Sequence, residues 1–305
     1  MSIEASTLPG RRARSSWHTV GAYVALTKPR IIELLLITTL PTMVVAQRGL
    51  PPVWLMAATL VGGALAAGGA NAINMYVDRD IDKVMHRTQQ RPLVTGVVQP
   101  TEALVFAIAI EVVAFFWLWA TVNLISAVLA VSACLFYVFV YTLWLKRTST
   151  RNIVIGGAAG AVPVLIGWTS VVGHLDWAPI VLFLVIVYWT PPHFWALAIK
   201  YRDDYAAVDV PMLPSVVSPR RTAVRILQYT LVLWLLTLVF SPVADMGAIY
   251  LVSALVLGAI FTVMAVTLLR TESTRSAMRL FGYSITYITL LFGSMVVDQL
   301  VRLPR

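Results

Sequence analysis

The sequence predicts an all-α membrane protein, a bundle of nine transmembrane helices with its N-terminus inside and its C-terminus outside. Two observations carry this prediction. Of the 305 residues, 59% are hydrophobic and only 12% are charged, about half the charged share of a soluble domain. The apolar residues also gather in runs of about 20, the length that an α-helix needs to cross the hydrocarbon core of a bilayer. A soluble fold of this size would need a more polar exterior.

Nine such runs follow one another along the chain, and each is predicted to form one helix. The junction at 121–123 is barely a turn, so the third and fourth runs are predicted to form a helical hairpin. The chain then divides into a cytosolic tail at 1–30, one transmembrane domain at 31–300 and a short external end at 301–305. The predicted spans are 31–48, 52–76, 101–120, 122–143, 153–172, 177–199, 223–241, 247–269 and 278–300.

The basic residues decide the predicted orientation. Twenty of the 23 Lys and Arg residues lie in the tail and in every second loop, and only Arg48, Arg302 and Arg305 lie on the other side. Because cytosolic loops of membrane proteins are rich in Lys and Arg, we expect the basic side to be cytosolic. The net charge of +9 is explained by this placement, so we expect no nucleic-acid partner. The single Cys134 excludes a disulfide framework and a cysteine metal site.

The polar stretch NAINMYVDRDIDK stands at the cytosolic end of the second span. At 100° per residue, four of its side chains share one helical face about a quarter-turn wide: Asn71, Asn74, Asp78 and Asp82. Asp80 falls on the opposite face, among Arg79, Lys83 and Arg87. Two carboxylates one turn apart repel each other unless a cation neutralises them, and Mg²⁺ prefers such oxygen ligands. The alternative is a solvated helix end that is balanced by its own arginines.

Two other cytosolic loops complement this face. The segment KYRDDYAAVDVPMLP, residues 200–214, adds three aspartates, and YTLWLKRTSTRN adds Lys146, Arg147 and Arg151 with no acid. A metal ion that bridges carboxylates to a diphosphate, with Lys and Arg on the remaining oxygens, would use all three loops. A loop that only anchored the cytosolic side would not need the aspartates. The sequence therefore predicts a metal–diphosphate site.

The same blocks resemble the UbiA-type intramembrane prenyltransferases. The spacing NxxxDxxxD from Asn74 to Asp82, followed by RTxxRPLxxG up to Gly96, is similar to the signature of that family. The KR pair after YTLWL and the nine spans extend the likeness. LTKPRIIELLLITT, GGAAGAVPVLIGW, YWTPPHFWALAIKYRDDY and LFGYSITYITLLF resemble one branch of the family, the haem O synthases. The similarity runs from about residue 23 to residue 300, and the blocks agree in order.

The resemblance implies a helical bundle around a cavity that opens to the cytosol and the lipid, in the cytoplasmic membrane of a bacterium. The implied reaction transfers a farnesyl group from farnesyl diphosphate to a vinyl group of the substrate haem b, and water then captures the resulting cation to give haem O. One or two Mg²⁺ ions would assist ionisation of the diphosphate. Concentrated positive charge and a water-poor aromatic pocket favour such chemistry. A haem A synthase or a terminal oxidase assembly would receive the product.

Carried onto this sequence, the family motifs give the charged residues expected roles. The first metal would be held by Asn74, Asp78 and Asp82. The second DxxxD motif of the family is absent here, so the second metal falls to Asp204, with Asp203 next. Asp78, Asp82 and Asp204 are the expected catalytic carboxylates. The expected diphosphate-binding residues are Arg87, Arg91, Lys146, Arg147 and Lys200.

Other ionisable residues need their own interpretation. His193, in TPPHFW, lies inside the sixth span, where an ionisable side chain is a functional hypothesis by default. It would ligate haem iron, contact a propionate or the diphosphate, or simply be a packed, hydrogen-bonded histidine. Glu111, in the third span, is expected to be protonated or paired inside the bundle in preference to lining a cavity. Lys28 and Arg30 flank Pro29, and we expect them to anchor the interface in preference to contacting diphosphate.

Two rival functions stay open. A prenyltransferase of the same class could use an aromatic quinone precursor or a chlorophyll-type acceptor, although such an acceptor gives no reason for a buried histidine in YWTPPHFW. A transporter of haem or of an anionic lipid would centre its polar sites at the membrane midplane, on broken helices with internal repeats. Here the acids gather at one face and no clear repeat is seen, so the prenyltransferase is favoured.

Overall fold

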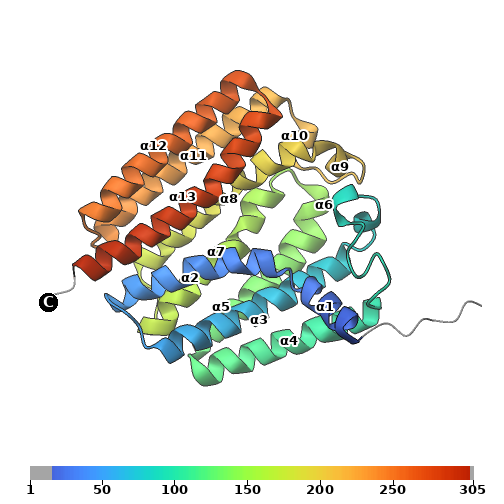
Figure 1. Ribbon diagram of the computed structural model, residues 1–305, viewed down its shortest axis with the longest axis horizontal. Coiled ribbons are helices and arrows are strands. Elements are labelled where there is room, and N and C mark those ends of the chain that lie inside the picture. The colour runs from blue at the N-terminus through green and yellow to red at the C-terminus, as the bar shows by residue number, and fades with distance from the viewer. Residues whose placement is uncertain (1–15, 303–305) are drawn as a thin grey trace, which may run out of the picture.

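The computed structural model describes residues 16–302, with the side chains at 16–18, 30–31 and 33–36 outside the description. Every regular element in this part of the chain is helical, and the helices pack into one bundle (Figure 1). The predicted all-α class is confirmed. Eight helices within the described range are long and apolar enough to cross a membrane. They are α3 (Val53–Val77), α4 (Pro100–Thr121), the continuous α5–η3–α6 (Leu124–Thr148), α7 (Asn152–Val172), α8 (Trp177–Lys200), α11 (Pro219–Val243), α12 (Ala248–Thr271) and α13 (Thr274–Val301).

The predicted first span corresponds to α2 (Pro29–Gln47). Its described apolar part, Ile37–Gln47, is shorter than a crossing helix. The structure therefore shows eight crossing helices in the described residues where the sequence predicted nine. The boundaries of all nine predicted runs lie within a few residues of observed helices, because Pro, Gly and charged clusters mark the helix ends in the sequence.

One helix was not predicted. α1 (Ser16–Leu26) lies inside the segment treated as a tail, and its eleven residues are too short for a search for spans of about 20. Leu26 is fully buried against Ala72 and Met75 of α3, and the ring of Tyr23 meets that of Phe106 edge-on at 5.0 Å. This apolar contact holds α1 against the bundle. Residues 1–15 of the predicted tail lie outside the described residues.

The continuous helix α5–η3–α6 contains a wide segment that the sequence patterns did not predict. α5 (Leu124–Leu135) passes into the π-helix η3 (Phe136–Leu145) before the short α6 (Lys146–Thr148). Inside it the rings of Tyr137 and Tyr141 stack with centroids 5.3 Å apart. A Cβ on Gly156 of α7 would lie 2.3 Å from the Tyr141 ring, so only glycine permits this approach. Single π-turns inside α-helices are frequent at functional sites.

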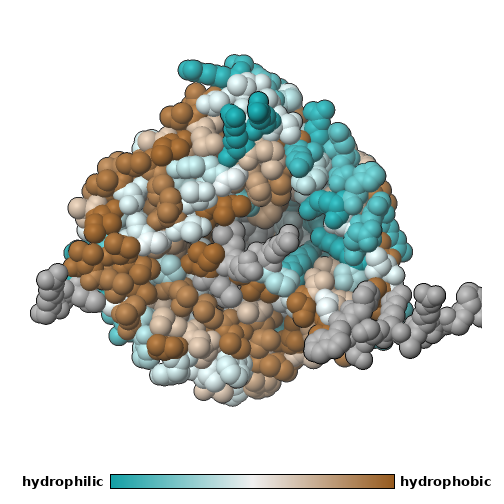
Figure 2. All heavy atoms as spheres, viewed as in Figure 1, coloured by the Kyte–Doolittle hydropathy of each residue, from teal (hydrophilic) through white to brown (hydrophobic). Residues whose placement is uncertain are grey.

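The second half of the bundle is built around α8, which packs against α7, α11 and α13. Large buried aromatic side chains fill this half: Trp189, Phe240, Tyr250, Phe261 and Tyr287. Hydrophobic side chains cover much of the visible face in Figure 2, whereas hydrophilic ones gather at one end. At that end lie the α3–α4 connection, α6, and the short helices α9 (Arg202–Ala206) and α10 (Leu213–Val216) (Figure 1). The fold thus brings the three charged loops to one end of the membrane-spanning bundle.

Candidate active site

The three aspartates after α3 have different environments. The α-helix ends at Val77, one residue beyond the predicted end of the span, and a 3₁₀ turn, η1 (Ile81–Lys83), follows where the helical angles had been applied. Asp82 N nevertheless donates to Asp78 O at 2.9 Å, which preserves one helical turn between the two residues. Asp78 and Asp82 are 0% and 2% exposed, whereas the Asp80 side chain is 59% exposed. Asp80 is therefore separated from Asp78 and Asp82, as the helical angles predicted, although the backbone that carries these residues is not a continuous α-helix.

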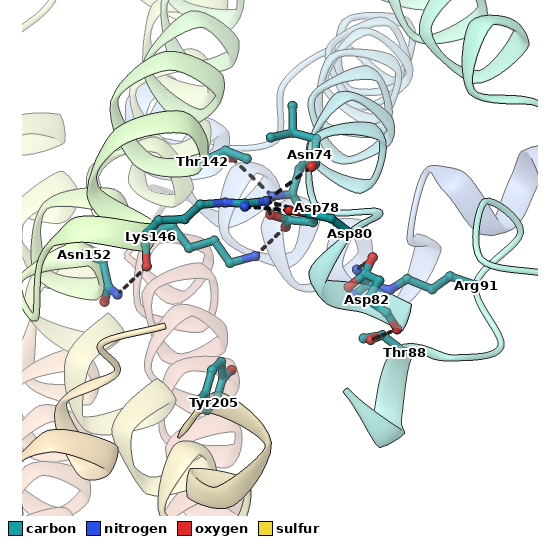
Figure 3. Close-up of polar contacts among 12 residues, drawn as sticks. Asn74, Asp78, Asp80, Asp82, Thr88, Arg91, Thr142, Lys146, Asn152 and Tyr205 are labelled. Carbon is teal, nitrogen blue, oxygen red and sulfur yellow. Dashed lines mark hydrogen bonds and ion pairs between the residues drawn. The ribbon is translucent and has the colours of Figure 1, made fainter. Parts of the chain in front are cut away.

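Asp78 lies at the centre of the buried polar cluster. Its Oδ2 accepts hydrogen bonds from Asn74 Nδ2 at 2.8 Å and from Lys146 Nζ (Figure 3). Its Oδ1 is buried and accepts no hydrogen bond within the described residues, with Arg147 Nη2 3.9 Å away. A buried carboxylate oxygen without a donor is costly unless something positive meets it. This oxygen fits a ligand position for a hard cation such as Mg²⁺, which binds through one or two carboxylates and keeps several waters.

Asn74 connects Asp78 to two other elements. Its Nδ2 also donates to Thr142 Oγ1 in η3 at 3.2 Å, and its Oδ1 accepts from Lys28 Nζ at 2.7 Å. The amide oxygen expected to face a metal therefore faces an ammonium group. Burial, followed by the positive charges of Arg91 and Lys146, lowers the pKa of Lys28 to about 7. Lys28 thus points into the site, where the sequence favoured an interfacial anchor, and the side chain of Arg30 lies outside the described residues.

Asp82 is held by the segment that follows it. Arg91 Nη1 lies 2.5 Å from Asp82 Oδ2, and the buried Thr88 donates its hydroxyl to Asp82 O at 3.0 Å. Thr88 belongs to the second 3₁₀ turn, η2 (His86–Thr88). The RTxxRP block therefore folds back over the acidic turn, and Figure 3 shows Arg91 reaching Asp82 on the side away from Lys146. The fold brings this predicted diphosphate-binding arginine to the predicted metal ligand.

Asp80 does not pair with the neighbours that the helical angles suggested. Both of its oxygens accept 2.7 Å hydrogen bonds from Arg147, whose pairing holds the pKa of Asp80 down at about 2. Arg79 instead stacks over the Tyr76 ring at 4.4 Å. The predicted partners Arg79, Lys83 and Arg87 are therefore wrong, because the real partner is 67 residues away and lies on another helix. Local spacing does not reveal such a long-range pair.

Tyr205 links the two acidic loops and was not predicted from the sequence. This buried residue of α9 accepts a hydrogen bond on its hydroxyl from Arg87 Nη2 at 3.0 Å. Burial raises the pKa of Tyr205, so the hydroxyl stays protonated. Tyr205 directly follows the two aspartates of KYRDDY, which could have marked it as a site residue. The sequence does not indicate, however, that its ring is buried. The hydrogen bond thus ties Arg87 of the α3–α4 connection to α9.

The acidic residues of α9 do not join Asp78 and Asp82. The Asp203 side chain is 94% exposed and pairs with Arg202 at 3.3 Å, whereas Asp204 is half-buried and makes no hydrogen bond or ion pair in the described part of the chain. Lys200 stacks over the Tyr201 ring at 5.4 Å. Lys200 and Asp203 line a separate pocket of about 270 Å³ beside α11. Among the described residues, no three His, Cys, Asp or Glu side chains are grouped closely enough to hold a metal ion.

His193 is enclosed by aromatic rings between α8 and α13. Its ring stacks on Trp189 at 4.4 Å and faces Phe281 at 4.7 Å, and its Nδ1 lies 2.7 Å from Ser284 Oγ. Because the Ser284 hydroxyl donates to Phe281 O at 2.6 Å, His193 Nδ1 is the donor in this pair. Its Nε2 then keeps a lone pair and has no partner in the described residues. His193 is therefore packed and hydrogen-bonded, as one of the interpretations expected, and its Nε2 is free to bind a ligand.

Glu111 lies inside the bundle, as expected. It contacts the Cys134 thiol and the Ala70 backbone, while its Oε1 is buried without a hydrogen-bond partner in the described residues. A Cβ on Gly69 would meet the Glu111 side chain at 2.6 Å, so glycine lets the carboxyl approach α3. No cation lies within ion-pair distance of Glu111 in the described structure. This favours the protonated form over the paired form.

Comparison with known proteins identifies the family to which this chain belongs. The UbiA prenyltransferase family matches residues 35–292. The chain belongs to this family. A curated relative from Frankia casuarinae, "Protoheme IX farnesyltransferase", is 55% identical over 283 residues, which are 92% of this chain and 98% of that one. Other relatives about half identical carry the same name. The protein is accordingly an integral membrane enzyme of prenyl transfer.

Solved structures of low identity show that the family fold is present. A digeranylgeranylglyceryl phosphate synthase superposes with a TM-score of 0.76 at 15% identity, covering 93% of this chain and 99% of that one. A UbiA homologue from Archaeoglobus fulgidus, solved with GPP and Mg²⁺, gives a TM-score of 0.63 at 16% identity, covering 90% of this chain and 99% of that one. Both likenesses extend over most of the bundle, so the helical architecture is that of the family.

Proposed function

We propose that this protein transfers a farnesyl group from farnesyl diphosphate to a vinyl group of haem b and forms haem O. The observation that carries the proposal is the 55% identity to a protoheme IX farnesyltransferase over nearly the full length of both chains. Family membership argues against the transporter considered from the sequence. An aromatic acceptor remains the rival substrate, and the enclosed His193 favours haem over it, because a free imidazole nitrogen suits an iron ligand.

The buried carboxylates fit a divalent metal. Asp78 and Asp82 would hold Mg²⁺, and Asn74 would join them only if Lys28 released its oxygen. Asp204, which has no partner in the described structure, is the proposed ligand for a second ion; Asp203 is less suited because it faces solvent beside Arg202. When bound, Mg²⁺ would neutralise the diphosphate and make it a better leaving group. The GPP- and Mg²⁺-containing homologue supports this choice of metal.

The cations of the cluster would bind the diphosphate and stabilise it as it leaves. Lys146 pairs with Asp78, and Arg91 pairs with Asp82. A diphosphate bound at these two carboxylates would therefore contact both cations. Arg87, from the same α3–α4 connection as the carboxylates, would reach the diphosphate while its bond to Tyr205 of α9 orients it. Arg147 acts through its pairing with Asp80 as a positioning residue. In many enzymes most of the rate acceleration comes from fixed positive charge at the oxygens where negative charge develops.

The bonding changes balance with water as the only added reactant. The allylic C–O bond breaks and the pair of electrons leaves on the diphosphate. The terminal vinyl carbon of haem b then bonds to C1 of the farnesyl cation, and water adds to the other vinyl carbon and loses a proton. The stacked rings of Tyr137 and Tyr141, which precede Lys146 on the same helix, offer an aromatic wall for an allylic cation. His193 is the proposed haem contact.

The topology belongs to the same proposal. α2 has nineteen residues, which span about 28 Å as an α-helix and nearly match a hydrocarbon core of about 30 Å. Counting α2 gives nine spans and places the N-terminus inside and the C-terminus outside. The polar cluster then faces a cavity on the cytosolic side of a bacterial cytoplasmic membrane, where the basic loops lie. Residue 175 lies in the α7–α8 connection and residue 245 in the α11–α12 connection. Reporter fusions at these two residues would place both connections outside the cell if the topology is right.

Turnover with defined substrates tests the function. Purified protein given farnesyl diphosphate, haem b and Mg²⁺ should release diphosphate and produce a haem heavier by one farnesyl group and one hydroxyl group, seen by mass spectrometry. A parallel reaction with 4-hydroxybenzoate should give no product. Prenylated 4-hydroxybenzoate without any modified haem would overturn the proposal in favour of an aromatic acceptor.

A further inference from the structure

Lys28 enters the candidate site through a strained backbone. It has φ 53° and ψ 63°, the left-handed region that non-glycine residues rarely adopt, and it directly precedes Pro29. A following proline normally favours an extended conformation, so this geometry is doubly disfavoured. Residues in such conformations persist only when their surroundings hold them, and they cluster at functional sites. The strained turn separates α1 from α2 and aims the Lys28 side chain at α3.

A stripe of three α3 residues, spaced three apart, holds this turn in place. Gly68 lets the Thr27 side chain come so close that an added Cβ would lie 3.1 Å from Thr27 Cβ. One turn later, Asn71 Nδ2 donates to Thr27 O at 3.2 Å, and the last member, Asn74, accepts from Lys28 Nζ at 2.7 Å. The position of Lys28 is therefore specified by packing and by two hydrogen bonds from the same helix face.

The charges around Lys28 do not balance. When Lys28 is protonated, three cations, Lys28, Lys146 and Arg91, face two carboxylates, Asp78 and Asp82, which leaves one positive charge in excess. Like charges this close repel one another, and Lys28 feels both other cations. An anion bound between them would remove the repulsion. The Lys28 ammonium also has donors to spare, because it can donate three hydrogen bonds and makes one in the described structure.

We propose that Lys28 binds the diphosphate of the prenyl substrate, as a third cation of the site supplied by the α1–α2 turn. The inference rests on the prenyl diphosphate half of the proposed function and is independent of the acceptor. Lys28 bridges Asn74 and the phosphate oxygens, so that α1 and its turn form part of the substrate site. Neither the acidic motif nor the KR pair includes this residue.

Binding measurements on matched variants test the role. Lys28→Gln removes the charge and keeps a donor, and Lys28→Arg keeps the charge. Lys83→Gln removes an exposed lysine of η1 whose side chain makes no hydrogen bond or ion pair in the described structure. The probe is farnesyl thiolodiphosphate, an analogue that ionises slowly, titrated with Mg²⁺ by calorimetry. Lys28→Gln should bind the probe at least tenfold more weakly. Lys28→Arg should stay within threefold of wild type and Lys83→Gln within twofold, while haem binding, followed by the Soret band, is unchanged in all three.

Protection of the wild-type lysines gives a measurement that does not depend on the folding of a variant. Saturating probe should slow acylation of Lys28 at least fivefold in peptide mass spectrometry and leave Lys83 unchanged. The inference would be overturned if the probe did not slow the acylation of Lys28. It would also be overturned if a folded Lys28→Gln variant bound the probe with wild-type affinity. Equal losses of probe binding, haem binding and thermal stability in Lys28→Gln would reduce Lys28 to a structural role. A wild type that does not bind the probe removes both proposals, whereas probe binding without haem product removes only the haem acceptor.

Discussion

Arg147 binds both oxygens of Asp80 at 2.7 Å and thereby ties the end of the continuous helix α5–η3–α6 to the turn that follows α3. The same turn presents Asp78 to Lys146, the residue next to Arg147 in the chain. Arg147 therefore binds the exposed face of the turn, and its neighbour Lys146 binds the buried face. This division predicts different consequences for substitutions at the two aspartates.

Asp78→Asn should lower turnover by about 100-fold or more while the protein stays folded. The amide keeps the shape but removes the negative charge that the metal and Lys146 need, and losses of this size are typical of electrostatic catalytic groups. Diphosphate release measures the effect, with size-exclusion chromatography as the check on folding. Asp209→Asn is the matched control, since Asp209 is exposed and asparagine tolerates its φ of 52°. Near-normal turnover of Asp78→Asn would remove Asp78 from the metal site.

Asp80→Ala should leave Mg²⁺ dependence unchanged and cost little stability. The Asp80 side chain is 59% exposed and that of Arg147 is 34% exposed, so solvent screens their attraction. A double-mutant cycle with Arg147→Ala should give a coupling free energy of about 1 kcal/mol or less, the usual worth of an exposed pair. A large rise in the Mg²⁺ concentration needed for activity would show that Asp80 binds metal after all.

Tyr205→Phe should raise KM for farnesyl diphosphate about 5- to 30-fold and change kcat much less. Removing the hydroxyl frees Arg87, and a hydrogen bond to a charged group contributes about 1–2 kcal/mol when it is lost. Tyr201→Phe is the control, because that hydroxyl makes no hydrogen bond in the described structure while its ring meets Arg87 and Lys200. Equal KM values for the two variants would contradict the assigned role of Tyr205.

His193→Ala should weaken haem binding, seen as a loss or shift of the Soret band on titration, without changing affinity for farnesyl diphosphate. Ser284→Ala removes the hydroxyl that orients the ring and should weaken haem binding less. If both variants bind haem as the wild type does, His193 is a packed histidine and the haem contact lies elsewhere.

Sequence patterns predicted the helices and the acidic face well because both depend on local spacing. Apolar run length located the helices, and a 100° step separated Asp80 from Asp78 and Asp82. The helix end at Val77 was predicted to within one residue, but the 3₁₀ turn beyond it was not, because the polar face continues through residues 78–82 without a break in pattern. Partners on other helices, such as Arg147 for Asp80, also escaped prediction, because pairing across the bundle depends on packing between helices and not on neighbours in the chain.

Two residues illustrate the limit most clearly. Lys28 was interpreted as an anchor since it stands beside Pro29 at the start of an apolar run, a common place for one. Its inward path depends on a left-handed backbone and on three residues of α3, none of which is visible locally. Tyr205 was overlooked beside two aspartates, yet it is the buried member of that loop.

The π-helical segment Phe136–Leu145 has a consequence for the register of the helix beyond it. A wide turn uses about one residue more than an α-turn, which rotates everything that follows by about 100°. Lys146 and Arg147 follow that segment directly, so the extra residue sets their angular position against Asp78 and Asp80. Deleting a single residue between 136 and 145 would leave the span long enough for the membrane but would swing the two basic side chains out of alignment with the acidic turn.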